Sequence, residues 1–63
     1  MNAYKNFLIR DAIRNQAKAR YYAEAARKAR ETNDEALFDI YSWQAKGYAQ
    51  IARESLFKLI ELR

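Results

Sequence analysis

Acidic side chains gather at one point of the sequence, at Asp34, Glu35 and Asp39. Neighbouring carboxylates can act as general acid and base, or hold a hard cation such as Mg²⁺. Carboxylates at the start of a helix also stabilise its N-terminal dipole, and these three follow a run of cations. Helix capping therefore explains the cluster without a catalytic role.

The other residue types that catalysis most often uses are missing, because the chain contains neither His nor Cys. These side chains supply most zinc, haem and iron–sulfur ligands, and most nucleophile–base pairs contain one of them. The chain has a single Gly, so it contains no Gly-rich phosphate-binding loop motif. We therefore expect no enzyme activity, no metal, no cofactor and no small-molecule substrate.

The formal net charge of +4 is unevenly distributed. Residues 1–31 carry eight Lys or Arg against three Asp or Glu, whereas residues 32–63 carry four against five. Basic charge favours nucleic acid, an anionic membrane surface or an acidic protein as a partner. The first half of the chain is therefore where an electrostatic partner is expected.

A basic face on the first half is the candidate site for nucleic acid. Arg10, Arg14 and Lys18 recur every four residues and form a row along a helix. Tyr21 extends this row, and Arg20 lies to one side of it. The cations can follow phosphates and Tyr21 can stack on a base, which predicts binding to structured RNA. A solvated helix face with no ligand is the alternative explanation of the same pattern.

Two exposed aromatic residues in the second half are the candidate site for a protein partner. Trp43 and Phe57 project opposite the main apolar stripe of their helix, and Gly47 lies one turn from Trp43. Aromatic side chains are common anchors of protein interfaces. Gly within a helix costs about 1 kcal/mol relative to Ala, which suggests a packing reason for it. The alternative is that both aromatics complete an oligomer core.

The elements that position these residues are helices. The chain has no Pro and is rich in Ala, Arg, Lys, Glu and Leu, which are strong helix formers. One segment breaks the pattern at residues 31–34, where Thr32 followed by Glu35 matches a capping box. Asn33 and Asp34 are also residue types that favour the N-cap position. Cations that suit a helix C-terminus precede the break and can face the carboxylates after it: Arg27, Lys28 and Arg30.

We therefore expect a helix at about residues 3–31, a turn at about 31–34 and a second helix at about 34–62. Equal lengths and a short connection predict an all-α antiparallel hairpin. The whole chain, residues 1–63, is then a single helical-hairpin domain.

Helical periodicity places one Ala-rich packing face on each helix. The first face comprises Tyr4, Leu8, Ala12, Ala19, Tyr22, Ala23 and Ala26. The second comprises Leu37, Tyr41, Ala45, Tyr48, Ala52, Leu59 and Leu62. Amides that can fix the helix register lie at or beside these faces: Asn15, Gln16 and Gln44. Small side chains allow the two helices to approach closely.

More apolar residues are present than two helices can bury against each other. The excess comprises Ile9, Ile13, Phe38, Leu56 and Ile60. A chain of 63 residues forms a marginal core, and no disulfide is available to stabilise it. We expect a homodimer of hairpins that forms a four-helix bundle with these residues in the interface.

These observations predict a non-enzymatic protein-interaction module, a regulator or inhibitor that docks on a larger protein as an oligomer. The alternative is a regulator that binds structured RNA through the basic face. The longest apolar runs are three residues, too short for a membrane span or a signal peptide. The lack of Cys fits a reducing compartment, so we expect a cytoplasmic protein that does not associate with membranes.

Overall fold

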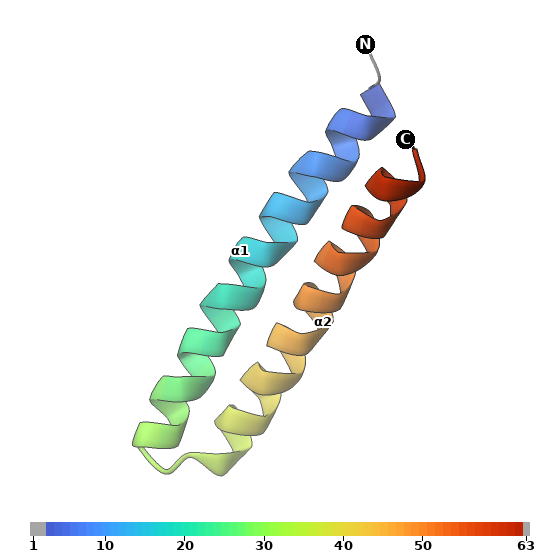
Figure 1. The fold of residues 1–63 in the computed structure, drawn as a ribbon. Helices are drawn as coiled ribbons and strands as arrows, with labels where there is room; N and C mark the ends of the chain where they lie inside the picture. The colour runs from blue at the N-terminus through green and yellow to red at the C-terminus, as the bar shows by residue number, and fades with distance from the viewer. Residues whose placement is uncertain (1–2, 63) are drawn as a thin grey trace.

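A turn near the middle of the chain separates two long helices of similar length (Figure 1). The computed structural model describes residues 3–62, with α1 at Ala3–Glu31 and α2 at Glu35–Glu61. The helices lie side by side, and the start of α1 and the end of α2 are at the same end of the molecule. The predicted antiparallel hairpin is confirmed, and its helix bounds agree to within one residue.

The turn is built around a left-handed residue. Asn33 has a φ of 61°, in a region that Asn adopts more readily than most residues. The Asp34 N–H donates to the Ala29 carbonyl at 2.9 Å, and the Asn33 N–H donates to the Arg30 carbonyl at 3.1 Å. These two bonds form a Schellman motif, which ends α1 and reverses the chain direction.

Asp34 caps α2, and the predicted capping box at Thr32 is wrong. The Asp34 carboxylate accepts a hydrogen bond from the Leu37 N–H at 3.1 Å, which satisfies one free amide of the first turn. The Thr32 hydroxyl instead donates to the Ala29 carbonyl at 3.1 Å. Because the chain reverses at Asn33, Thr32 belongs to the end of α1.

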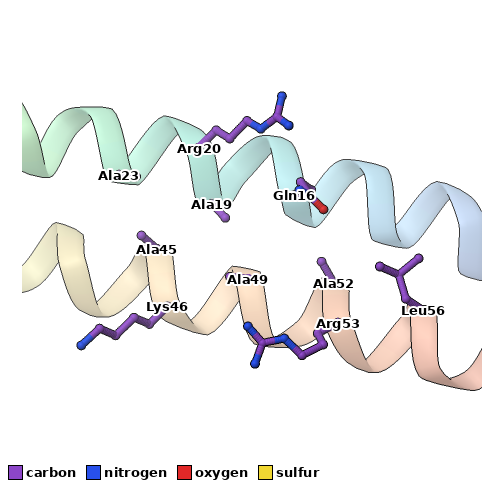
Figure 2. Close-up of a pocket in the computed structure, with 10 residues that line it drawn as sticks. All are labelled: Gln16, Ala19, Arg20, Ala23, Ala45, Lys46, Ala49, Ala52, Arg53 and Leu56. Atoms are coloured by element: carbon purple, nitrogen blue, oxygen red, sulfur yellow. The ribbon is translucent and has the colours of Figure 1, made fainter.

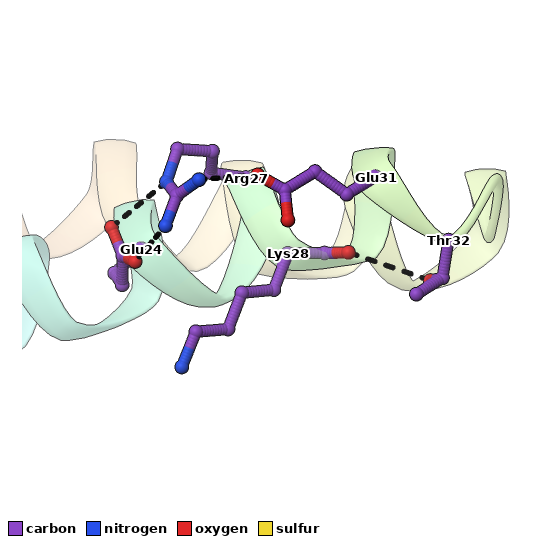
Figure 3. A network of polar contacts seen from close by, with 5 residues as sticks. All are labelled: Glu24, Arg27, Lys28, Glu31 and Thr32. Atoms are coloured by element: carbon purple, nitrogen blue, oxygen red, sulfur yellow. Dashed lines mark hydrogen bonds and ion pairs between the residues drawn. The ribbon is translucent and has the colours of Figure 1, made fainter.

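Of the cations before the turn, Arg30 lines a hollow with the carboxylates after it, Asp34, Glu35 and Asp39, but no ion pair joins them. Arg27 pairs with Glu24 and Glu31 of its own helix (Figure 3). The hydrogen bond from Arg27 is the main cause that lowers the pKa of the Glu24 carboxyl. The Arg30 guanidinium lies 5.1 Å from the centre of the Phe38 ring. Water screens the exposed Arg27 pairs, so their contribution to stability is small.

A seven-residue repeat of buried and half-buried residues forms the seam between the helices. In α1 the seam comprises Leu8, Ala12, Asn15, Ala19, Tyr22, Ala26 and Ala29. In α2 it comprises Phe38, Tyr41, Ala45, Tyr48, Ala52, Ser55 and Leu59. Alternating steps of three and four residues are the pattern of a coiled coil.

Four residues that were predicted on the packing faces are exposed instead: Tyr4, Ala23, Leu37 and Leu62. Tyr4, Ala23 and Leu37 each lie one position away from the seam. Leu62 continues the repeat at the last turn of α2, but it is exposed.

Polar residues take two of the seam positions, and one of them, Ser55, connects the helices. The Ser55 hydroxyl donates to the Asp11 carboxylate at 2.8 Å, and the Asn15 amide donates to the Asp11 carbonyl of its own helix at 2.8 Å. The bond from Ser55 joins one fixed pair of residues across the seam, and it therefore favours one register of the helices.

The core is shallow because much of the seam is alanine. No side chain within residues 3–62 is completely enclosed, and the molecule is a rod with extents of 49 × 15 × 11 Å. More than half of the surface of Ile13, Tyr21, Trp43 and Phe57 is exposed. Two helices in contact along one seam leave both sides of the rod uncovered.

Candidate interaction surfaces

A groove runs between α1 and α2 on one side of the rod (Figure 2). Alanines from both helices make its floor: Ala19, Ala23, Ala45, Ala49 and Ala52. The other residues that line it are Gln16, Arg20, Lys46, Arg53 and Leu56. Methyl groups leave the space between the helix backbones unfilled on this side. We call this surface the alanine groove.

The alanine groove continues toward the turn. A second hollow shares Ala23, Ala45 and Lys46 with it and adds Arg30 and other residues close to the turn. Gln16 and Arg30 are fourteen residues apart on α1, which corresponds to about 21 Å along the helix. The groove is therefore long enough to accept about four turns of a third helix.

Four of the five predicted interface residues form an apolar cluster at the open end of the rod. Ile9, Ile13 and Ile60 each lie seven residues, or two turns, from a residue that lines the groove, and thus on the same side of the rod. Leu56 lines the groove itself. All four are exposed. We call these residues the open-end cluster.

Phe38, the fifth predicted interface residue, lies apart from the open-end cluster. It is half-buried near the turn, where Arg30 covers its ring. The predicted interface residues therefore share one side of the rod but occupy its two ends, with the alanine groove between them.

A shallow pocket on α2 brings together two of the three predicted partner-binding residues. Trp43 and Gly47 line it with Gln44, Tyr48 and Ile51. Trp43 is 77 % exposed, the largest exposed fraction among the large apolar side chains of the described residues. A Cβ atom built on Gly47 would meet nothing within 4 Å, so no contact within the hairpin requires Gly there. We call this pocket the Trp43 surface.

Phe57 does not belong to the Trp43 surface. It is exposed on α2, but fourteen residues separate it from Trp43, or about 21 Å along the helix. Periodicity correctly places both aromatics on the outer side of α2, but the distance along the axis keeps them from forming one binding patch.

The predicted basic face is divided by the fold. Arg10 and Arg14 line a shallow depression near the start of α1. The Lys18 Nζ lies 5.3 Å from the centre of the Tyr48 ring, and Arg20 is at the alanine groove. Tyr21 is 69 % exposed and packs edge-on against its neighbour Tyr22. The five predicted residues therefore do not make one continuous row.

A stack of tyrosines at the middle of the seam was not predicted as a unit. The Tyr22 ring lies 5.6 Å from Tyr48 with an interplanar angle of 5°, and 6.1 Å from Tyr41 with an angle of 28°. Stacked aromatic pairs contribute about 0.5–1.5 kcal/mol beyond the burial of their surface. The seven-residue spacing of Tyr41 and Tyr48 is the sequence signal that could have revealed the stack.

Within residues 3–62, no group of three acidic or other metal-ligating side chains comes together that could hold a metal ion. Neither α1 nor α2, over the residues described, combines the length and the apolar character needed to cross a membrane.

Comparison of the chain with models of known protein families, with curated proteins and with solved structures found no match in any of the three.

Proposed function

We propose that the protein is a non-enzymatic interaction module that self-associates and docks on a larger protein. The observation that carries this proposal is the amount of apolar surface outside the seam, where thirteen large apolar side chains of residues 3–62 are at least 39 % exposed. Exposed apolar patches of this kind mark interaction sites in small proteins. Self-association would bury the open-end cluster, whereas Phe38 already packs in the seam at the other end of the rod.

The Trp43 surface supports docking on another protein. A Trp side chain in the centre of an interface contributes a large apolar contact at low conformational cost, and Trp is enriched among interface hot spots. Gly47 leaves bare backbone beside it, so a partner can approach α2 closely. No contact within the described residues explains either the exposure of Trp43 or the presence of Gly47.

A pull-down from host lysate, with and without nuclease, tests this function. The wild-type chain should retain a protein after nuclease treatment, and Trp43→Ala should lose it. Phe7→Ala removes another exposed aromatic, on α1, and should retain the partner. Circular dichroism would verify that both variants remain helical. Equal capture by wild type and Trp43→Ala would contradict the proposed docking surface.

Binding to structured RNA through Arg10, Arg14, Lys18, Arg20 and Tyr21 is the competing function. The exposure of Tyr21 favours it. Lys18 lies over the Tyr48 ring and Arg20 lies at the groove. These positions weaken the RNA hypothesis, because the cations are not aligned to contact successive phosphates of one RNA strand.

A salt titration separates these two functions. If the basic face neutralises about four phosphates, the affinity for RNA should fall about two orders of magnitude between 50 and 200 mM salt. Binding through the Trp43 surface should change much less, because apolar burial is barely screened. Arg14→Glu should abolish RNA binding and leave protein capture intact.

A further inference from the structure

The alanine groove has the shape of a seat for a third helix. Its floor of methyl groups lies between two parallel ridges of larger side chains, and helices pack by fitting ridges into such grooves at axis separations of about 8–10 Å. Figure 2 shows Ala19, Ala45 and Ala52 pointing into the space between α1 and α2. A third helix of about 14 residues would cover the groove from Gln16 to Arg30.

Cations without partners flank this apolar floor. Arg20 extends from α1, and Lys46 and Arg53 extend from α2, all away from the floor (Figure 2). Between residues 3 and 62, the salt bridges are those of Arg27 with glutamates of its own helix, so none involves these three cations. A ligand that fits the groove therefore meets methyl groups at its centre and positive charge at both edges.

Toward the turn the charge is mixed, because Arg27 pairs with glutamates of its own helix and Arg30 also lines a hollow with Asp34, Glu35 and Asp39. Arg30 lies at the end of the groove, and its guanidinium rests on Phe38 rather than on a carboxylate. Within the described residues, the groove cations without a carboxylate partner are therefore those along its middle: Arg20, Lys46 and Arg53. Electrostatic complementarity favours a partner whose edges are negative.

A second copy of the chain, packed with its groove against this one, would not be electrostatically complementary to it. Packed groove against groove, two copies would place Arg20, Lys46 and Arg53 of one against the same cations of the other, and like charges across an interface are repulsive. RNA would be attracted by the positive charge of the groove edges, but its bases and phosphates would not be bound by the alanine floor. Alanine methyls offer no ring for a base to stack on, and they would desolvate phosphates without donating hydrogen bonds.

From these observations we propose that the alanine groove binds an acidic amphipathic helix of a partner protein and completes a three-helix bundle. The partner helix packs small and aliphatic residues onto the alanine floor, and its flanking Asp or Glu residues pair with Arg20, Lys46 and Arg53. This adds a second binding surface, with a defined partner chemistry, to the proposed interaction module. Lys46 borders both this groove and the Trp43 surface, but Trp43 itself does not line the groove.

Three labelled peptides test the proposal by fluorescence anisotropy against the full chain. Each is a helix of about 18 residues with one Ala/Leu stripe, flanked by Glu in the first peptide, Gln in the second and Lys in the third. The Glu peptide should bind, the Gln peptide should bind about tenfold more weakly, and the Lys peptide should not bind. Three exposed ion pairs, each weak alone, give a loss of that size.

Charge reversal on the chain provides the matched control. The triple variant Arg20→Glu, Lys46→Glu, Arg53→Glu should lose the Glu peptide and bind the Lys peptide. A second triple variant, Arg10→Glu, Arg14→Glu, Lys18→Glu, changes the net charge by the same amount at positions away from the groove. It should still bind the Glu peptide more tightly than the Lys peptide. Equal loss in both variants would mean that only the net charge matters, and would overturn the proposal.

Filling the floor tests the shape independently of charge. Ala49→Leu places a larger side chain in the groove and should weaken binding of the Glu peptide about tenfold or more, because the helices can no longer approach closely. Ala17→Leu adds the same group to an exposed position of α1 and should have no effect. Thermal melts would verify that both variants fold. Unchanged binding by Ala49→Leu would show that the peptide lies elsewhere.

Two further outcomes would assign the groove to another occupant. If wild type associates with the groove triple variant more tightly than with itself in sedimentation experiments, the groove pairs with a second copy. If a short RNA duplex displaces the Glu peptide and binds the groove variant more weakly than the control variant, the ligand is RNA. Trp43→Ala should bind the Glu peptide normally, so failure of this proposal is distinguishable from failure of the Trp43 surface.

Discussion

At the scale of single residues, Asn33 controls how the hairpin turns. Its φ of 61° is strained for a β-branched residue but not for Gly. We expect Asn33→Val to destabilise the hairpin by about 1–2 kcal/mol and Asn33→Gly to leave it within a few tenths. Urea unfolding followed by circular dichroism measures both. Equal stability of the two variants would show that the chain can turn in another way.

Gly47 is the second residue for which a single substitution should separate an effect on stability from an effect on binding. Its Cβ position is open, so Gly47→Ala should stabilise the hairpin by up to about 1 kcal/mol through helix propensity alone. The same methyl group should weaken capture of a partner at the Trp43 surface. Lys58→Ala, at an exposed position of the same helix away from that pocket, should change neither property greatly. A variant of Gly47 that gains stability and keeps full capture would remove Gly47 from the proposed site.

At the scale of the elements, the seam depends on small side chains. Ala52 is 3 % exposed, and Ala52→Leu should destabilise the hairpin by about 1–3 kcal/mol because the added atoms force the helices apart. Ala17→Leu makes the same chemical change on the outer surface of α1 and should be nearly neutral. Denaturant midpoints compare the two directly. A midpoint for Ala52→Leu at or above that of wild type would mean that the seam has room for larger residues.

At the scale of the whole molecule, the thin rod should gain stability by self-association. Sedimentation equilibrium at micromolar concentration should show a dimer, and thermal stability should rise with protein concentration. Ile13→Lys, in the open-end cluster, should weaken the dimer about tenfold or more because a buried Ile contributes about 1.5–3 kcal/mol. Ile40→Lys changes another exposed Ile and should have little effect. A monomer whose melting is independent of concentration would contradict self-association.

Local chemistry was enough to predict the elements of this protein from its sequence. Helix propensity is a property of each residue and its near neighbours, and the chain offers one break in an otherwise strong helical composition. The helix bounds, the antiparallel hairpin and the outward position of Trp43 on α2 therefore follow without tertiary information. The choice of Asp34 over Thr32 as the cap does not, since it depends on the left-handed conformation of Asn33.

Tertiary structure decided which residues share a surface. Hydrophobicity does not distinguish Ala19, in the seam, from Ala23, beside it, because the difference depends on how each helix is rotated toward the other. The bond from Ser55 to Asp11 joins polar residues 44 positions apart, for which the sequence carries no local signal. The alanine groove needs both helices at once, and Arg20 joins it only because α1 presents that side to α2. Residue type and local order determine the helices, whereas surfaces shared by two helices exist only after they pack.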